Sequence, residues 1–231
     1  MALDSGSIEK VENIIGYHFR DKAHIRTALT HKSYVNEKMT GHPESYEKYE
    51  FLGDAILEYI SSEFLFEEYK ELAEGELTKL RASLVCEFTL SKIVRALKLG
   101  QFILFSKGEK LTGGADRDSI LCDIFESVLG AIYLDGGMEP AREYVKKHLL
   151  TDIESKRRFH DSKTMIQEYA QSKGLEINYE TVGESGPDHM KTFEVVLKIG
   201  GEKVGHGVGS SKKNAEQEAA YEALNRLQEE S

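Results

Sequence analysis

The feature that most limits how this chain can fold is an apolar helical stretch, ILCDIFESVLGAIYLD, that carries acidic residues. Asp123 and Glu126 are the only charged residues between Ile120 and Leu134. A helix formed by this stretch must therefore be buried over most of its surface. A buried carboxylate that has no partner costs several kcal/mol or takes up a proton. The sequence therefore indicates that the carboxylates of Asp123 and Glu126 have a partner that offsets this free-energy cost.

A second stretch, EKYEFLGDAIL, places three acidic residues on one side of a predicted helix. Glu47, Glu50 and Asp54 fall at positions i, i+3 and i+7, which share one helical face. Like charges at this spacing repel each other. A divalent cation held between the two stretches would offset both the free-energy cost of burying the carboxylates and the repulsion between them. Mg²⁺ suits such a site because it is a hard ion that takes oxygen ligands.

Acidic triples at helical spacing also arise by chance, because 40 of the 231 residues are Asp or Glu. Glu63, Glu67 and Glu71 form such a triple, and the polar neighbours of Glu67 predict a solvated face. Asp54 differs because its neighbours along the chain are apolar, namely Phe51, Leu52, Ala55, Ile56 and Leu57. From the residues alone two interpretations stay open: a metal site, or buried acids that pair with Lys or Arg.

Both acidic stretches resemble a known family. EKYEFLGDAIL (47–57) is similar to the signature of ribonuclease III, E-R-L-E-F-L-G-D-A-V-L, and ILCDIFESVLGAIYLD (120–135) resembles the second acidic helix of that family. Further matches follow in the expected places: ALTHKS (28–33), EGELTKLRASLV (74–85) and KGEKLTGG (107–114). The resemblance covers nearly the whole chain, and this set of motifs in this order is highly specific.

The departures from the family pattern are mild. Lys48 stands for the usual Arg, Tyr49 for Leu, and Tyr46 for the Asn that often precedes the signature. The insert from Val35 to Ser45 is longer than in many relatives. No departure falls on a carboxylate position, so the resemblance implies an active enzyme.

The resemblance implies an endonuclease that hydrolyses double-stranded RNA with Mg²⁺, for which Mn²⁺ can substitute. It implies products with 5′-phosphate and 3′-hydroxyl ends and short 3′ overhangs, in the processing of rRNA and other RNA. The acidic residues that it assigns to the metal and its attacking water are Glu50, Asp54, Asp123 and Glu126. It makes Asp54 and Glu126 the strongest catalytic candidates and places Glu47 and Glu74 further along the cleft.

The resemblance also implies a twofold homodimer with one site for each RNA strand. Phe51 matches the aromatic residue that seats in the partner subunit of the family dimer. From the residues alone core packing is an equally good role for Phe51, because it adjoins Leu52. The sequence itself does not decide between the two roles.

Periodicity predicts that the first part of the chain is almost wholly helical. Apolar residues recur at intervals of three and four over 8–28, 49–72, 77–97, 119–135 and 139–155. Gly53 interrupts a good helix, at a cost near 1 kcal/mol relative to Ala, and a close approach of another helix is the expected reason. The length suits a helical endonuclease domain of about 150 residues and a second domain of about 70.

The last seventy residues change to an α-β-β-β-α pattern. A helix over 163–173 capped by Gly174, strands over 177–183, 193–199 and 203–209, and a helix over 212–227 are expected. This order resembles the double-stranded RNA-binding domain, most specifically at GPDHMKTFEV and GSSKKNAEQEAA. We therefore expect a catalytic and dimerisation domain at 1–154, a linker at 155–160 and an RNA-binding domain at 161–231.

The resemblance suggests three RNA-contacting zones in the second domain. They comprise the outer face of its first helix (Thr164, Gln167, Glu168 and Gln171), His189 in a turn, and the start of its last helix (Ser211, Lys212 and Lys213). A-form RNA is read by shape over roughly 16 base pairs, through 2′-hydroxyls and phosphates. Ordinary solvated helix and a common helix cap are the alternatives for these residues.

The net charge of −10 is unusual for a protein that binds nucleic acid. Residues 1–160 carry 22 Lys and Arg against 27 Asp and Glu, and residues 161–231 carry 8 against 13. RNA binding would therefore need local basic clusters and the bound cations. The strongest cluster, Lys156, Arg157 and Arg158, lies in the expected linker, where phosphate contact and a solvated tether are equally plausible.

Composition favours a soluble, cytoplasmic protein that has no membrane partner. No apolar run is long enough to span a bilayer, and MALDSGSIEK lacks the apolar core of a signal peptide. Cys86 and Cys122 lie in apolar helical stretches without metal-ligand spacing, which is typical of buried thiols in a reducing compartment.

Two other classes of protein compete with the nuclease. A non-catalytic double-stranded RNA-binding protein could keep both folds, but such relatives lose carboxylates that this chain retains. A metal-dependent phosphohydrolase of the HD type is also helical and acidic. Its His-Asp pair occurs here at His160 and Asp161, in the expected linker and without further ligands nearby in the sequence.

Overall fold

The computed structural model describes residues 3–38, 44–186 and 191–229. Its contacts divide the chain into two compact units, Met1–Thr151 and Asp152–Ser231. His189 lies outside the described residues, as do parts of the Val35 to Ser45 insert and of the GPDHMKTFEV turn. No helix in the described ranges is long and apolar enough to cross a membrane.

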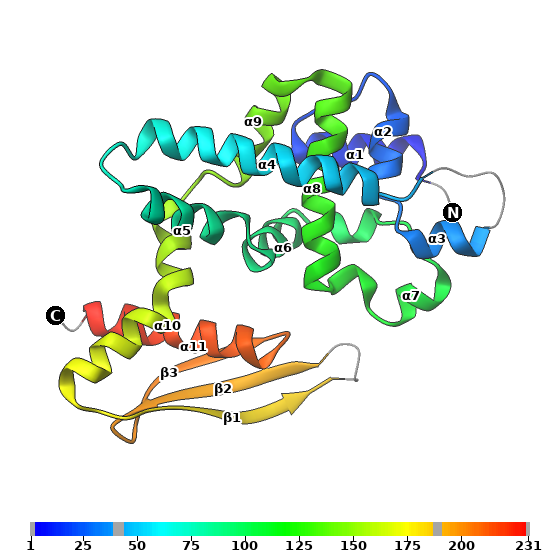
Figure 1. Cartoon of the computed structure of the whole chain (residues 1–231). Coiled ribbons are helices and arrows are strands. Elements are labelled where there is room, and N and C mark those ends of the chain that lie inside the picture. Colours follow the sequence, from blue (N-terminus) through cyan, green and yellow to red (C-terminus); the bar gives the residue numbers. More distant parts are fainter. Residues whose placement is uncertain (1–2, 39–43, 187–190, 230–231) are drawn as a thin grey trace. The chain divides into compact units, whose positions relative to one another are not determined.

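The first unit is built from helices, as expected (Figure 1). They are α1 (Ser5–Ile15), α2 (Lys22–Ala28), α3 (Lys32–Lys38), α4 (Glu47–Glu68), α5 (Glu74–Val85), α6 (Glu87–Ala96), α7 (Lys107–Leu111), α8 (Asp118–Gly136) and α9 (Met138–His148), with short 3-10 turns η1 (Leu99–Phe102) and η2 (Gly114–Asp116). α8 contacts α2, α4, α6 and α9. Every residue of α8 from Ile124 to Ile132 is buried, which confirms the burial predicted for this stretch.

Three of the expected helices are each interrupted. The 8–28 stretch breaks at Gly16, whose φ of 80° ends α1, and restarts where the Asp21 side chain caps α2. The 77–97 stretch breaks at Cys86, which has an extended backbone between α5 and α6. The 139–155 stretch ends with α9 at His148. At the first two breaks the apolar periodicity continues because both flanking helices bury residues in the first unit. The third break lies where the first unit ends and the second begins.

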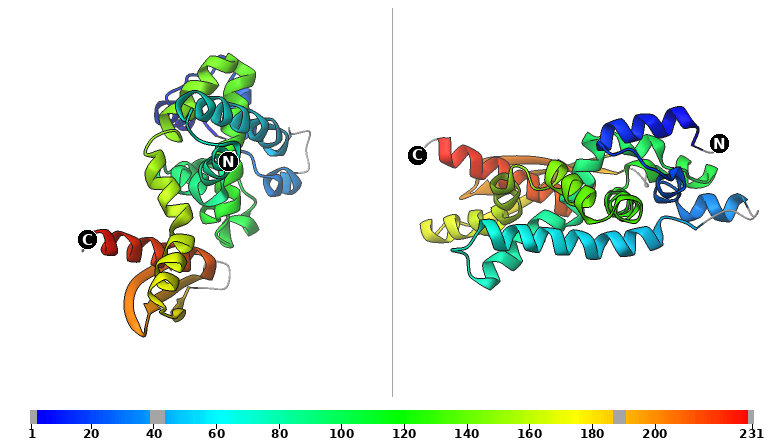
Figure 2. Two further views of the ribbon diagram at one scale, coloured as in Figure 1. Left: turned by 60° about the vertical axis from the view of Figure 1, so that its left-hand side comes forward. Right: turned by 90° about the horizontal axis from the view of Figure 1, so that it is seen from above.

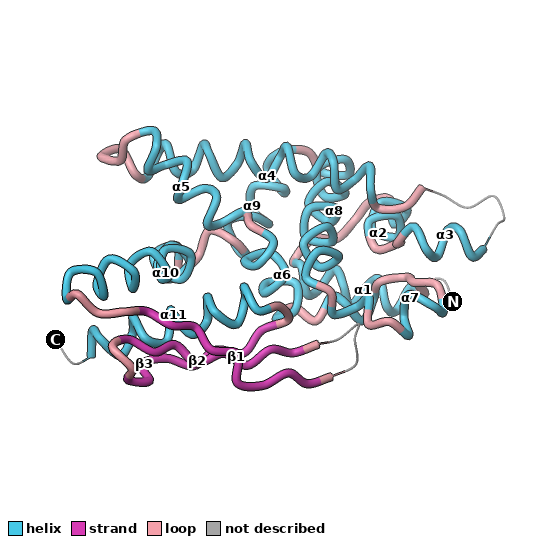
Figure 3. Tube along the Cα trace, turned by 60° about the horizontal axis from the view of Figure 1, so that its bottom comes forward, coloured by secondary structure: helices cyan, strands magenta, loops and turns pink. Residues whose placement is uncertain are grey.

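The second unit has the predicted α-β-β-β-α order. α10 (Ile153–Lys173) leads to an antiparallel sheet with strand order β1 (Ile177–Ser185), β2 (Thr192–Ile199) and β3 (Glu202–Gly209), and α11 (Lys212–Glu229) follows (Figure 3). α11 packs against β3 and β2. A Cβ atom on Gly207 would overlap the carbonyl oxygen of Ala215. The glycines of β3 therefore let the backbone of α11 approach the sheet closely.

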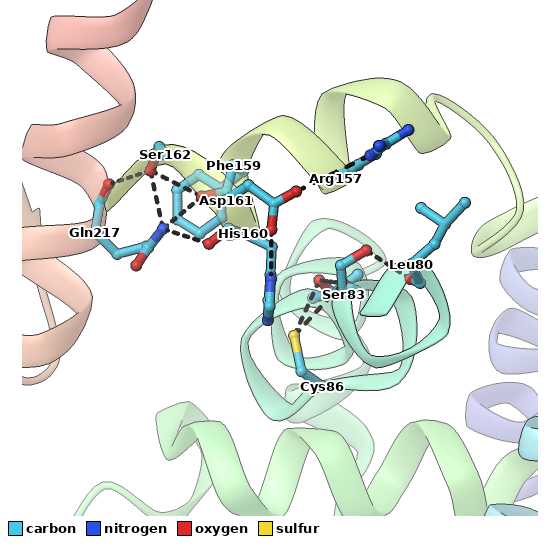
Figure 4. A network of polar contacts seen from close by, with 10 residues as sticks. Leu80, Ser83, Cys86, Arg157, Phe159, His160, Asp161, Ser162 and Gln217 are labelled. Carbon is cyan, nitrogen blue, oxygen red and sulfur yellow. Dashed lines mark hydrogen bonds and ion pairs between the residues drawn. The ribbon is translucent and has the colours of Figure 1, made fainter. Parts of the chain in front are cut away.

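The structure places residues 155–160, which we expected to form a linker, inside α10. The Gln217 side chain on α11 donates hydrogen bonds to the carbonyl oxygens of Phe159 and His160 and to Ser162 Oγ (Figure 4). The Phe159 ring also meets the Tyr221 ring edge-on at 5.3 Å. These contacts hold the segment to α11, so it is part of the second unit.

Candidate metal centre

The candidate site lies where α4 crosses α8. A Cβ atom on Gly53 would overlap the carbonyl oxygen of Glu126, and one on Gly130 would overlap the carbonyl oxygen of Tyr49. The two backbones therefore touch, which confirms the close helix approach expected at Gly53. This contact brings the acidic face of α4 against the two acids of α8.

Three carboxylates meet at this crossing. Glu50 of α4 and Asp123 and Glu126 of α8 each offer an oxygen, and these oxygens lie within 4.8 Å of one another. Within the described ranges this is the one group of three or more His, Cys, Asp or Glu side chains with such geometry. Glu126 is the most deeply buried of the three, at 9% exposure. The crossing thus assembles an all-oxygen cluster from the two acidic stretches.

The electrostatics of the cluster favour protonation or a cation. Burial, together with the charges of Asp54 and Asp123, raises the pKa of Glu126 to about 8. Burial and then Asp123 raise the pKa of Glu50, and burial raises the pKa of Asp123. Three carboxylates that resist ionisation together are stabilised when a positive charge lies between them.

The cluster fits a hard divalent cation better than an internal ion pair. Among the described residues, no Lys or Arg lies within ion-pair distance of Glu50, Asp123 or Glu126. The polar partner of the Glu126 carboxylate is the Cys122 thiol, whose sulfur is 3.9 Å from Oε1 and is a weak donor. The structure therefore does not support the alternative of acids paired with Lys or Arg.

Asp54 differs from the expectation. Its apolar neighbours in the sequence predicted a buried carboxylate, but Asp54 is exposed and lies outside the cluster of three. That prediction was wrong because Phe51 and Ala55 are exposed as well. Asp54 is nevertheless close enough that its charge raises the pKa of Glu126 more than any other neighbouring charge does. It lies at the rim of the centre.

Glu47 and Glu74 both lie outside the cluster. Glu47 is exposed in the first turn of α4, where Lys32 Nζ is 3.2 Å and Ser45 Oγ 2.9 Å from its carboxylate oxygens. The hydrogen bond from Ser45 and the one from Lys32 lower the pKa of Glu47. Glu74 is exposed at the start of α5, where it accepts a hydrogen bond from Thr78. Neither residue contributes to the three-carboxylate group.

Phe51 does not pack in the core of this chain, because its side chain is 80% exposed. Tyr59 and Phe66 on the same helix are 52% and 75% exposed. Their spacing of eight and seven residues places all three on one stripe, which we call the α4 apolar stripe. α4 runs as a long helix along the edge of its unit, as the right-hand view of Figure 2 shows. Sequence analysis identified Phe51 but missed Tyr59 and Phe66, although their spacing could have revealed them.

The proposed RNA-contacting residues of α10 are all exposed, as expected for an outer face: Thr164, Gln167, Glu168 and Gln171. Gln167 and Gln171 line an open groove between α10 and β1. At the start of α11, Ser211 Oγ accepts a hydrogen bond from the Asn214 amide at 3.1 Å, so Ser211 is the helix cap. Lys212 and Lys213 follow it and are exposed.

Two residues near the centre were not predicted as site residues. Tyr46 is 4% exposed, and its hydroxyl donates a hydrogen bond to Asp123 Oδ2 at 2.8 Å. Cys122 faces Glu126, as described above. No sequence pattern marks either residue, because their roles follow from the crossing of two helices that are distant in the sequence.

Comparison with known proteins decides the family. A model of ribonuclease-III-like domains matches residues 21–153, and a model of the double-stranded RNA-binding motif matches residues 162–227. The chain belongs to the ribonuclease III family. The family is metal-dependent, which agrees with the carboxylate cluster.

The relatives of the chain span nearly its full length. Ribonuclease 3 from Caldanaerobacter subterraneus is 44% identical over 221 residues, covering 94% of this chain and 96% of the relative. Ribonuclease 3 from Bacillus velezensis is 42% identical over 217 residues, covering 93% and 87%.

A crystal structure of the ribonuclease III nuclease domain from Campylobacter jejuni is also similar. It is 43% identical, with a TM-score of 0.56, and covers 61% of this chain and 91% of that one. A second structure of the Campylobacter domain describes flexibility in a region involved in dimer formation.

Membership of this family makes the chain an endoribonuclease and supports endonucleolytic cleavage of double-stranded RNA. The alternatives carry less support. Among the described residues, His160 and Asp161 do not belong to any group of three side chains that could hold a metal ion. The structure therefore gives no support to a metal site of the HD phosphohydrolase type. A protein that only bound RNA would have no use for a cluster of carboxylates that, among the described residues, has no Lys or Arg partner.

Proposed function

We propose that this endoribonuclease uses Mg²⁺, with Mn²⁺ able to substitute, held by Glu50, Asp123 and Glu126. The observation that carries the proposal is the cluster of three carboxylate oxygens within 4.8 Å, with no ion pair to Lys or Arg in the described residues. When bound, the cation would lower the pKa of a water and neutralise charge that develops on the phosphate. Asp54 and Glu126 remain our principal catalytic candidates.

The protein side chains have distinct tasks in this proposal. Glu126 is held by the buried body of α8, so its carboxylate has little freedom to turn away. Asp54 is exposed at the rim, where it can reach substrate and solvent. Water attack at phosphorus with departure of the 3′ oxygen leaves 5′-phosphate and 3′-hydroxyl ends. Glu47 and Glu74 are exposed acids that we assign to the outer part of the cleft.

We assign the recognition of the duplex to the second unit. Gln167 and its neighbours on α10 supply neutral donors and acceptors for 2′-hydroxyls in the minor groove. The N-terminus of α11 presents Lys212 and Lys213 to phosphates. Because the chain carries a net charge of −10, this local arrangement must overcome a repulsive background. His189 would add a third contact.

We propose that the active form is a homodimer in which the α4 apolar stripe is covered by a second copy. Three large side chains exposed along one helix are costly in water and are typical of an interface. The Campylobacter nuclease domain, which has a region involved in dimer formation, supports this arrangement. A twofold axis would give one site for each strand and staggered cuts with short 3′ overhangs.

Duplex segments in rRNA precursors and in other structured RNA are the substrates that we propose. Recognition by shape, without a required base sequence, suits helical regions of many transcripts. We place the reaction in the cytoplasm, where the two free cysteines would stay reduced.

The decisive experiment separates binding from cleavage. The full chain should cut a perfect RNA duplex in Mg²⁺ and should bind it without cutting in EDTA. Glu126→Gln and Asp54→Asn should reduce single-turnover cleavage by orders of magnitude while duplex affinity stays near the parent value. Glu67→Gln, which removes one exposed charge from the same helix α4, is the matched control and should cleave normally.

Two results would contradict this proposal. Near-parental cleavage by either variant in saturating Mg²⁺ would show that the site is wrongly assigned. Tight duplex binding by the parent chain without any cleavage in Mg²⁺ or Mn²⁺ would instead favour a non-catalytic RNA-binding protein.

A further inference from the structure

The ALTHKS segment is a matched motif whose side chains lie outside the carboxylate cluster. Its contacts lead instead to Tyr46, the residue just before α4. The Tyr46 amide donates a hydrogen bond to the carbonyl oxygen of Thr30 at 2.9 Å. The His31 ring lies against the Tyr46 ring, with centroids 5.7 Å apart. The segment therefore packs against Tyr46.

Tyr46 connects this segment to the cluster. Its side chain is almost fully buried, and its hydroxyl donates to Asp123 Oδ2 at 2.8 Å. A phenol ring has few rotamers, so it delivers its hydroxyl to one place. Tyr46 also stands where the family signature is often preceded by Asn.

His31 is itself fixed from several sides. Its amide donates to the carbonyl oxygen of Leu104 at 3.0 Å, and its Nδ1 lies 2.8 Å from Ser33 Oγ. The Phe105 ring lies 5.2 Å from the His31 ring. Because His31 is held in this way, the Tyr46 ring cannot tilt away from α8 without disturbing the buried segment behind it.

We propose that Tyr46 is a positioning residue for the cation, supported by the ALTHKS segment, and that its hydroxyl fixes the orientation of the Asp123 carboxylate. The hydrogen bond to Oδ2 restrains the Asp123 carboxylate in the orientation that places one of its oxygens within 4.8 Å of those of Glu50 and Glu126. This inference rests on the proposed metal site at Glu50, Asp123 and Glu126. Tyr46 touches neither substrate nor cation, so it acts only through Asp123.

The size of the effect follows from other metal sites. Partners that orient a ligating carboxylate typically change metal affinity or activity by about 10- to 100-fold when they are removed. Without the hydroxyl, Asp123 would be free to sample other rotamers, and the cation would have to restrict it again on binding. The loss should therefore appear in cation affinity and disappear when the cation saturates the site.

Tyr46→Phe tests the proposal because it removes one oxygen atom and keeps the buried ring. Tyr17→Phe is the matched control, since the Tyr17 hydroxyl donates to Asp135 Oδ2 at 2.6 Å in the same unit. Mn²⁺ alone should be titrated into each full-length protein without RNA and followed by electron paramagnetic resonance. The Mg²⁺ dependence of single-turnover duplex cleavage should be measured in parallel.

Tyr46→Phe should weaken Mn²⁺ binding at least about tenfold and raise the Mg²⁺ concentration for half-maximal cleavage to a similar degree. Its rate at saturating Mg²⁺ should return close to that of the parent. Tyr17→Phe should bind Mn²⁺ like the parent. An unchanged Mn²⁺ affinity in Tyr46→Phe, or an equal loss in both variants, would overturn the positioning role. Failure of the parent chain itself to bind Mn²⁺ and cleave would count against the proposed function instead.

Discussion

The two units of this protein carry their functional residues in opposite environments. In the first, Glu126 is buried inside the most apolar helix of its unit. In the second, Gln167 and Lys213 are exposed on helix surfaces. A buried carboxylate has a large free-energy cost that can be recognised in the sequence, whereas an exposed polar residue has almost none. The comparison teaches that burial, more than residue type, makes a site visible before the structure is known.

Both units nevertheless use the same packing device. Gly53 lets α4 touch the backbone of α8, and Gly207 lets β3 touch the backbone of α11. In the first unit this contact assembles the carboxylate cluster. In the second it builds the core beneath an exposed binding surface. Substitution of Gly53 should therefore affect the carboxylate cluster, and substitution of Gly207 should affect the RNA-binding surface.

Gly53→Ala and Gly207→Ala should have the largest effects. Each places a methyl group on a backbone oxygen, so each should destabilise its unit by about 3 kcal/mol or more. Gly53→Ala should also lose Mn²⁺ binding, because its ligands move apart. Gly207→Ala should lose duplex affinity but retain Mn²⁺ binding. Denaturant unfolding and Mn²⁺ titration measure both outcomes, and parental Mn²⁺ affinity in Gly53→Ala would contradict the role of the crossing.

The same comparison explains what the sequence could predict. The burial of α8, the partnership of its acids with Glu50 and the reason for Gly53 followed from residue pattern and the cost of burial. The exposure of Asp54 did not, because neighbours along a helix point in different directions. Its apolar neighbours Phe51 and Ala55 lie on the exposed side of α4. The sequence marked Phe51 but could not say whether this chain or another one covers its ring.

The expected linker shows a related limit. The segment 155–160 is polar and charged, which suggested a tether. Its helix is held by Gln217 and Tyr221, which come more than fifty residues later in the chain. Such long-range contacts are invisible to local composition. Likewise the RNA-contacting roles in the second unit rest on resemblance, because nothing in their local sequence separates them from a solvated helix.

The next prediction concerns the α4 apolar stripe. Phe51→Ala should weaken dimerisation by about 3 kcal/mol, the typical cost of removing a buried aromatic ring. It should leave the stability of the dissociated chain nearly unchanged, because the ring is 80% exposed within it. Leu111→Ala is the control, since Leu111 is 79% exposed on α7, away from the stripe. Sedimentation equilibrium measures both. An unchanged dimer affinity in Phe51→Ala would remove the residue from the interface.

The pH dependence of stability provides a smaller effect. Folding raises the pKa of Glu126 from an ordinary 4.5 to about 8, so the folded protein holds a proton that the unfolded chain releases. The metal-free protein should therefore be stabilised by this group below pH 4.5 and lose that contribution as the pH rises through 8. Glu126→Gln should remove this loss and be more stable than the parent at alkaline pH.

Urea unfolding in EDTA across this pH range measures the difference between the two proteins. The gap should widen as the pH rises, and saturating Mg²⁺ should reduce it by stabilising the parent alone. Parallel stability curves for parent and Glu126→Gln would mean that Glu126 ionises in the folded state as easily as in water. The burial argument for the cluster would then fail.

The smallest effects should come from the exposed face of the second unit, where single contacts are worth little. Gln167→Ala should weaken duplex binding by about 1 kcal/mol, the net value of a typical hydrogen bond. Because Gln167 is neutral, the slope of log K against log salt should not change. Lys213→Ala should weaken binding by a similar amount and reduce that slope by about one, since it releases one fewer counterion.

Asn178→Ala supplies the control for this pair. Asn178 is exposed on β1, opposite Lys198 of β2, on the sheet face turned away from the core residues Val195 and Leu197. Its substitution should change neither affinity nor slope. If Asn178→Ala weakened binding as much as Gln167→Ala, the duplex would lie across the sheet. The second unit would then present a different face to RNA from the one that the helices α10 and α11 offer.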